Sequence, residues 1–157
     1  MTYPILLQTE WYEPVIYAIG GLTEVGFSLD AQYVLVVSHQ GRGIFDCNNA
    51  CKVMRENSQL NIDDWDENKR TIKGVGPLAG KDIYCVGLWG GSFPDSTADG
   101  WKLAISGIDI VKVTSPEGKV VSFLEPLTEL RAVGFSQDGN LFVYATNSEI
   151  LFYVRKI

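Results

Sequence analysis

The chain has 157 residues, of which 46% are hydrophobic and 20% are charged. This composition is typical of one folded domain with an apolar core, and it excludes a disordered or low-complexity chain. The net charge of -6 at pH 7 argues against binding to nucleic acid, because a phosphate backbone would be repelled. No apolar run approaches the roughly 18 residues that span a bilayer, so no membrane association is expected.

The first residues lack the pattern of a secretory leader. No basic residue precedes the first apolar run, and Glu10 and Glu13 follow it closely. Cys47, Cys51 and Cys85 make an odd count without the spacing of a disulfide framework, as expected in a reducing compartment. We therefore expect a cytoplasmic protein.

In chain order, two apolar segments come first, at residues 3–7 and 15–19, and both are predicted to be strands. Residues 22–37 then read LTEVGFSLDAQYVLVV, and a second copy of this phrase at residues 127–145 reads LTELRAVGFSQDGNLFVYA. In each copy an apolar strand ends at Ser, a turn with Asp follows, and a second apolar strand returns. This similarity predicts a repeated β-unit.

A degraded intermediate copy is predicted at residues 82–113. Its first strand is expected at 83–89, and its turn at Asp99-Gly100, after an insertion. The second and third strands are expected at 101–105 and 109–113, which are rich in apolar and β-branched residues. A Pro-Glu-Gly turn then leads into a further apolar segment that ends at Leu124.

Helical patterns are weak, since no segment sustains an apolar period of about 3.6 residues. The best helical candidates are residues 49–57 and 62–70, and in the second of these acidic residues precede Lys69-Arg70, which suits the helix dipole. We predict one all-β domain over residues 1–157, with small antiparallel sheets of three to four short strands each, in propeller-blade-like or sandwich packing. At most one or two short helices are expected, and the blade-like units are placed at about residues 15–56, 82–113 and 120–155.

The phrase from residues 109–113 through Glu117-Gly118-Lys119 into Val133-Gly134-Phe135-Ser136 resembles the connection between blades in WD40-type β-propellers. Phe45-Asp46 is similar to the aromatic-Asp pair that closes a blade strand in that family. The chain departs from the family pattern because no Gly-His pair precedes a blade and no Trp-Asp pair ends one. The resemblance therefore implies three degenerate blade repeats.

Propellers typically close with four to eight blades, whereas only three copies are found here. Three arrangements stay open: an open assembly of three small sheets, two chains that complete one ring, and a sandwich whose strands have blade-like sequences. We favour a compact all-β domain with local similarity to blades. Strand alternation is expected to bury Phe27 and Phe135, and Trp11 and Trp101 are expected to cap the core.

No residue pattern indicates catalysis. His39 is the only histidine, and no serine near it has the Gly-x-Ser-x-Gly setting of a hydrolase nucleophile. Cys47 and Cys51 do not have a standard zinc-ligand spacing. Residues 74–81 are rich in glycine, but their spacing and the Asp82 that follows do not match a phosphate-binding loop. We therefore expect no enzyme, no cofactor and no metal.

Acidic residues instead accompany aromatic residues in three segments outside the repeats, of which Glu10-Trp11-Tyr12-Glu13 is the first. Residues 63–67 read DDWDE, and residues 89–99 contain Trp89, Phe93 and two Asp. Aromatic side chains often anchor protein interfaces, and charges set the choice of partner. The predicted partner-binding residues are Asp63, Asp64, Trp65, Asp66, Glu67, Trp89, Phe93, Asp95 and Asp99. For Trp65 and Trp89, a role in the core is an equal alternative.

Together these features favour a non-enzymatic module that binds a basic protein. Its most concrete form is a cytoplasmic bacterial immunity protein that neutralises a basic toxin, such as a nuclease, because an acidic surface can cover a basic active site. The alternative is a propeller-like scaffold subunit that self-associates or docks in a larger complex, so a monomer and a homodimer are both compatible. A hydrolase with an unrecognised carboxylate site is a third possibility.

Overall fold

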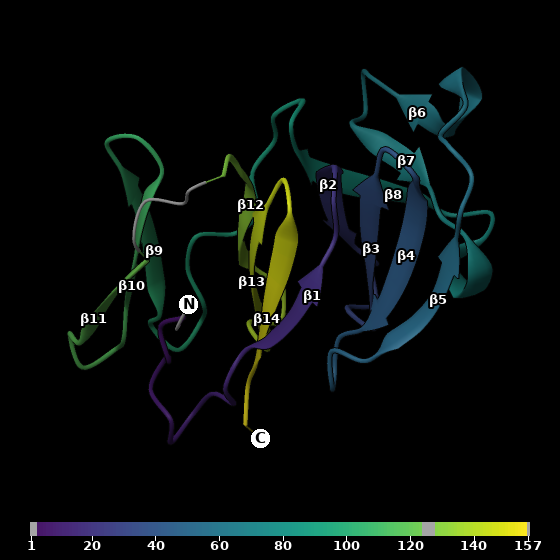
Figure 1. The fold of residues 1–157 in the computed structure, drawn as a ribbon. Coiled ribbons are helices and arrows are strands. Elements are labelled where there is room, and N and C mark those ends of the chain that lie inside the picture. The colour runs from purple at the N-terminus through teal and green to yellow at the C-terminus, as the bar shows by residue number, and fades with distance from the viewer. Residues whose placement is uncertain (1–2, 124–127, 157) are drawn as a thin grey trace.

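The structure is a computed structural model that describes residues 3–123 and 128–156. Within these ranges the chain forms fourteen β-strands, two 3-10 helices and no α-helix. The strands make three antiparallel sheets that do not close into a barrel (Figure 1). The all-β prediction is thereby confirmed, while Leu124 and Leu127, which were placed in predicted elements, lie outside the described residues.

The middle sheet has four strands in the order β1-β14-β13-β12. Its edge strand β1 comes from the other end of the chain: it pairs antiparallel with β14, and Val15 lies opposite Phe152. The sheet therefore joins the two ends of the described chain. Its strands are β1 (Val15–Ala18), β12 (Leu130–Phe135), β13 (Leu141–Thr146) and β14 (Glu149–Val154).

The other two sheets flank the middle sheet (Figure 1). On one side is a three-stranded sheet with the order β11-β10-β9, and on the other a seven-stranded sheet with the order β5-β4-β3-β2-β8-β7-β6. The smaller sheet comprises β9 (Lys102–Ser106), β10 (Ile110–Thr114) and β11 (Val120–Phe123). The larger comprises β2 (Leu22–Phe27), β3 (Tyr33–Ser38), β4 (Gly41–Asp46), β5 (Lys52–Glu56), β6 (Trp65–Asp66), β7 (Thr71–Lys73) and β8 (Asp82–Gly87).

The middle sheet is buried on both faces. Val143 and Phe152 belong to an apolar cluster shared with β2, β3 and β4, whereas Phe142 and Tyr153 belong to a cluster shared with β10 and β11. Alternate residues of a strand point to opposite faces, so β13 and β14 are apolar almost throughout. A third cluster covers the far face of β3 and β4 with residues of β7, β8 and the 3-10 helix η2 (Gly76–Leu78).

The repeat is visible in the hydrogen bonds of its turns. The Ser136 hydroxyl donates to Asp138 Oδ1 at 2.7 Å and accepts the Leu141 N–H at 3.1 Å, while the same Asp138 oxygen accepts the Asn140 N–H at 3.0 Å. These bonds close the turn between β12 and β13, because the side chains accept N–H groups that the ladder leaves free.

Similar bonds recur in the two other copies. The Ser28 hydroxyl donates to Asp30 at 2.6 Å and accepts the Tyr33 N–H at 3.0 Å. Before β9, the Thr97 hydroxyl donates to Asp99 at 2.6 Å and accepts the Trp101 N–H at 3.0 Å. The turn predicted at Asp99-Gly100 therefore forms and resembles the other two, although the N–H that Thr97 accepts lies four residues along the chain and not five.

The three sheets do not coincide with the predicted units at 15–56, 82–113 and 120–155, because some strands pair with strands of another unit. β1 leaves the first unit for β14, β8 leaves the second for β2 and β7, and β11 leaves the third for β10. Alternating apolar residues identify a strand, but they do not determine which free edge it pairs with. The larger sheet accordingly exceeds the expected three to four strands.

Three local predictions were wrong. Residues 3–7 form no strand, although Leu6 is buried in the core. The 62–70 segment is the short 3-10 helix η1 (Ile62–Asp64) followed by β6 and a turn, in which Asp66 Oδ1 accepts the N–H groups of Asn68 and Lys69. Most of the 49–57 segment is β5. Polar side chains such as that of Asp66 bind the local backbone, which favours turns over helices.

The predicted core aromatics are confirmed with one exception. Trp11, Trp101 and Phe135 are each at most 1% exposed. Phe27 is only partly buried, and its ring packs against Phe93 with centroids 4.8 Å apart. It therefore lies at the rim of the core rather than inside it.

The repeated turn makes a quantitative prediction. Ser136→Ala removes the hydroxyl that accepts the buried Leu141 N–H, so we expect the free energy of unfolding to fall by about 1–3 kcal/mol. Ser28→Ala should cause a similar loss, because its turn has the same bonds. Urea denaturation measures both. Ser122→Ala, at an exposed strand position, is the control and should change stability by less than about 0.5 kcal/mol. Equal values for all three variants would contradict the structural role of the turns.

Candidate functional site

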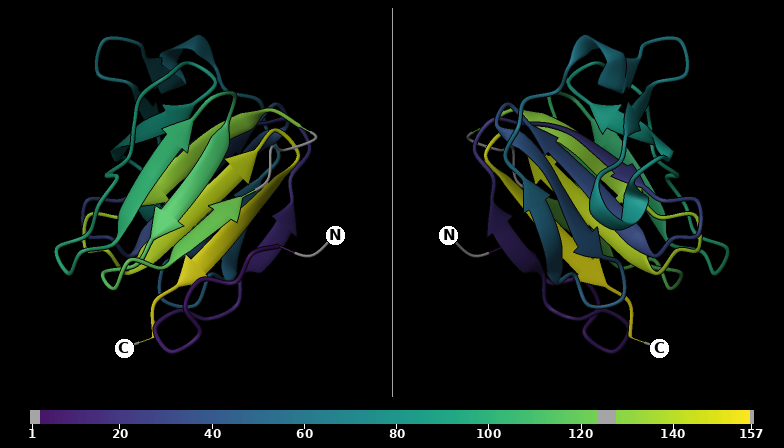
Figure 2. Two further views of the ribbon diagram at one scale, coloured as in Figure 1. Left: turned by 90° about the vertical axis from the view of Figure 1, so that its left-hand side faces the viewer. Right: turned by 90° about the vertical axis from the view of Figure 1, so that its right-hand side faces the viewer.

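The candidate site lies where η1, β6 and the turn after β6 project beyond one end of the stacked sheets (Figures 1 and 2). Trp65 belongs to β6, and Trp89 follows β8, yet their ring centroids are 5.1 Å apart. The pairing of β6 with β7, and of β7 with β8, brings these two distant segments together. We call the residues Asp63–Glu67, Leu88 and Trp89 the acidic–aromatic surface.

Arg70 holds the two tryptophans in place. Its guanidinium donates to the Trp89 carbonyl at 2.6 Å and to the Gly90 carbonyl at 2.7 Å, and its Cζ lies 5.7 Å from the centre of the Trp65 ring. At Gly91, where φ is +85°, a Cβ would lie 2.9 Å from Arg70 Nε. Only glycine therefore lets the chain pass this close to the guanidinium.

Glu24 also fixes the turn that carries Trp89. This residue of β2 is fully buried, and its Oε1 accepts the Trp89 N–H at 3.1 Å, while Oε2 has no partner among the described residues. Burial raises the pKa of Glu24 to about 6, although the Trp89 N–H and the charges of Arg70 and Arg131 oppose this rise. The main chain of Trp89 is thus held on both sides, and the residue as a whole remains 50% exposed.

An acidic hollow of about 370 Å³ adjoins Trp65. Two of its carboxylates have structural roles: Asp64 accepts the Asn61 N–H at 2.9 Å and lies 3.6 Å from the buried Arg42, and Asp66 shapes the turn after β6. Asp63 and Glu67 are exposed, and their carboxylates make no hydrogen bond or ion pair with other described residues. These two carboxylates can therefore meet a partner without breaking internal contacts.

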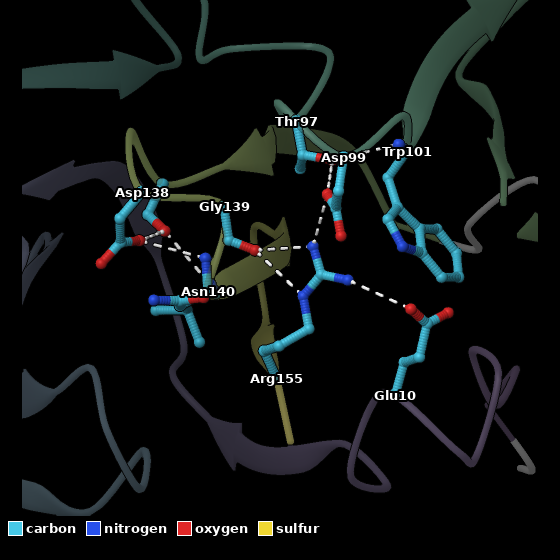
Figure 3. A network of polar contacts seen from close by, with 10 residues as sticks. Glu10, Thr97, Asp99, Trp101, Asp138, Gly139, Asn140 and Arg155 are labelled. Carbon is cyan, nitrogen blue, oxygen red and sulfur yellow. Dashed lines mark hydrogen bonds and ion pairs between the residues drawn. The ribbon is translucent and has the colours of Figure 1, made fainter. Parts of the chain in front are cut away.

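Three predicted site residues lie elsewhere. Phe93 is 9% exposed and belongs to the core beside Phe27, so its prediction as a partner contact is corrected. Asp95 is exposed, and its carbonyl accepts the Leu103 N–H at 2.7 Å. Asp99 lies beside Arg155, near the C-terminal end of the described chain (Figure 3), and this end is opposite the projecting β6 (Figure 1). The structure therefore unites residues 63–67 with Trp89 and separates them from the rest.

Asp99 belongs to a network around Arg155 (Figure 3). The guanidinium lies 3.1 Å from Asp99, 3.8 Å from Glu10 and 4.3 Å from the centre of the Trp11 ring. The Thr97 hydroxyl, and then the charge of Arg155, lower the pKa of Asp99. This network connects the turn before β9 to the end of β14, so it serves the fold.

The remaining candidate groups are the buried thiols and the residue types that bind metals. Burial raises the pKa of Cys47 to about 12 and also raises that of Cys85, so both thiols are poor nucleophiles at neutral pH. Within residues 3–123 and 128–156, no group of three or more His, Cys, Asp or Glu side chains is placed to hold a metal ion. In the same ranges, no helix is long and apolar enough to cross a membrane.

Glu24 and Arg70, the two residues that position Trp89, are not among the predicted site residues. A signal for Glu24 was available, because an acidic residue inside the apolar phrase of β2 is unusual for a buried strand. Arg70 carries no such signal in the sequence, because it lies at the end of the helix predicted at residues 62–70. Comparison of the chain with family models, with curated proteins and with solved structures found no match.

The buried carboxyl of Glu24 predicts a dependence of stability on pH. Its pKa is about 6 in the folded protein against an ordinary value of 4.5, so the folded state binds the proton more tightly. The stabilisation is complete below about pH 4.5 and is lost as the pH rises through about 6, a loss of about 2 kcal/mol. Glu24→Gln keeps an oxygen for the Trp89 N–H and should remove this part of the pH dependence.

Urea denaturation between pH 4 and 7.5 measures the effect. The difference in unfolding free energy between Glu24→Gln and the unmodified protein should shift in favour of the variant by about 2 kcal/mol over this range. Glu117→Gln, which removes an exposed carboxylate, is the control. A Glu24→Gln variant with an unchanged pH profile would mean that Glu24 is not buried as described.

Proposed function

We propose that the chain is a non-enzymatic protein-binding module that holds a basic partner on the acidic–aromatic surface. The observation that supports this most is that Trp89 is half-exposed while its main chain is fixed by Glu24 and Arg70. Because its main chain is already fixed, this residue loses less conformational entropy when a partner buries it than a residue on a mobile loop would. Trp is also the residue type most enriched among energetically dominant interface positions.

Charge supports a basic partner. Asp63 and Glu67 flank Trp65 without internal partners among the described residues, and the whole chain has a net charge of -6. Such a surface accelerates encounter with a positively charged protein and disfavours an acidic one. Leu88, which is 46% exposed, extends the apolar area beside Trp89.

The most concrete form of this proposal is a cytoplasmic immunity protein that covers the basic active site of a toxin, such as a nuclease. In this form the three blade-like repeats resembling WD40 units provide a rigid frame, and the projecting segment provides the contact. The partner's contact surface would be rich in Lys and Arg, because it must complement Asp63 and Glu67.

A second candidate is a scaffold subunit that self-associates. It is favoured by the outer face of the three-stranded sheet, where Ile110 and Val120 are 36% and 56% exposed. Light scattering separates the two proposals. A mass of 17.4 kDa at high protein concentration would exclude self-association, whereas a stable dimer would favour the scaffold.

Trp89→Ala tests the proposed surface. Immobilised protein is incubated with lysate at low salt, and the captured basic protein is purified and titrated against variants. We expect Trp89→Ala to weaken its binding at least tenfold, since dominant interface residues contribute about 2 kcal/mol or more. Asp63→Asn combined with Glu67→Gln should slow association and reduce its dependence on salt.

Ile108→Ala is the matched control, because this residue is 77% exposed and lies in the turn between β9 and β10, away from β6. It should bind the captured protein like the unmodified chain. Circular dichroism establishes that each variant is folded. Binding that survives both Trp89→Ala and the double charge substitution would reject the proposal.

A further inference from the structure

One of the three repeated units lacks most of its first strand. In the two complete copies, the strand before the turn pairs along nearly all of the next one, from Leu22 opposite Ser38 to Phe27 opposite Val34, and likewise in β12 and β13. Before the Thr97 turn, the strand pairing is reduced to one residue pair. Ser96 lies opposite Lys102, and the Leu103 N–H donates to the Asp95 carbonyl.

The pairing stops because the chain turns towards the middle sheet. The Pro94 carbonyl accepts the Phe135 N–H at 3.0 Å, so this residue faces β12 instead of β9. The preceding Phe93 is buried against Phe27. Beyond Leu103, therefore, no described strand pairs with the edge of β9 that the first strand of a complete unit would cover.

The register shows which backbone groups this leaves open. In an antiparallel pair, successive residues direct their N–H and C=O groups alternately towards and away from the partner strand. The Leu103 N–H donates to Asp95 and therefore points away from β10. Ile105 is two residues further along β9, so its backbone groups point away from β10 as well. The Phe135 N–H donates to Pro94 and points away from β13, so the backbone groups of Val133, two residues earlier in β12, also point away from β13.

Both residues line one hollow of about 320 Å³ between the edges of β9 and β12. Its other apolar lining includes Leu103, Leu130 and Val86, and Ile105 is 54% exposed there. The hollow thus combines unpaired strand edges with apolar side chains. An extended peptide needs both, because its main chain must be hydrogen-bonded and its alternate side chains must be buried.

We propose that this hollow binds an extended apolar segment of a partner protein, which replaces the missing first strand of the unit. The chemistry of that segment follows from the complete copies, where the equivalent position is filled by Leu-Thr-Glu-Val-Gly-Phe in β2 and Leu-Arg-Ala-Val-Gly-Phe in β12. The bound segment is a short strand with an apolar side chain at alternate positions. This site is separate from the acidic–aromatic surface and does not depend on its function.

A synthetic peptide tests the proposal directly. The probe is fluorescently labelled Leu-Thr-Glu-Val-Gly-Phe, titrated by polarisation, with a dissociation constant expected on the order of 10–100 µM. A second probe with Pro in place of Val lacks the central N–H and should bind at least tenfold more weakly. Equal binding of the two peptides would overturn a strand-like mode.

Paired protein variants locate the site. Ile105→Asp places a charge in the hollow and should weaken the peptide at least tenfold, whereas Ile108→Asp, in the exposed turn nearby, should change its affinity by less than about twofold. Hydrogen exchange of the unmodified protein gives a readout that needs no variant. The peptide should slow exchange of the Ile105 and Val133 N–H groups.

Three results would overturn the proposal. The first is no binding of the probe at 1 mM (roughly 4 kcal/mol of affinity) to folded protein. The second is no protection of Ile105 and Val133 in the presence of bound probe. The third is a dimer in light scattering that Ile105→Asp dissociates, because the occupant would then be a second copy of this chain.

Discussion

The pairing of β1 with β14 is the interaction on which the other sheets depend. It completes the middle sheet, and this sheet supplies one wall of the two apolar clusters on either side of it. Tyr17 on β1 strengthens the connection, since its hydroxyl donates to the Ala50 carbonyl at 2.8 Å and its ring lies 4.7 Å from that of Phe45. Because β13 and β14 are buried on both faces, loss of either flanking sheet would expose an apolar surface to water.

The candidate site follows from how the inserted strands are attached to this frame. β8 pairs with the free edge of β2, and that pairing places the turn carrying Trp89 directly over Glu24. β7 then positions β6, and with it Trp65, beside Trp89. The exposed rings therefore rest on a buried carboxyl and a guanidinium, so the geometry of the surface is set by the sheet and not by a mobile loop.

Local structure could be predicted from the sequence because it depends on neighbouring residues. The Ser-x-Asp turns and the strands on either side of them form as the repeated phrase indicated. Sheet membership could not be predicted in this way, since β1 and β8 pair with β14 and β2, which lie far away in sequence. The acidic run and Trp89 were identified from composition, but their proximity depends on β7, whose three residues carry no functional signal.

The burial of Phe93 could not be predicted from the neighbouring residues. An aromatic residue in a glycine-containing insertion resembles an exposed anchor, yet its backbone lies between two sheet edges and its ring fills the space beside Phe27. Burial of such a residue is decided by the packing of whole sheets, which no local pattern contains.

The closure of the middle sheet by β1 also has a consequence for biosynthesis. Val15 leaves the ribosome long before Phe152, its partner in the sheet. During translation β1 therefore has no partner strand until nearly all other strands have been made. Contacts between such distant residues slow folding, and a waiting apolar strand is open to pairing with other chains. The short length of β1 and the alternation of half-buried and exposed residues along it reduce this hazard during translation.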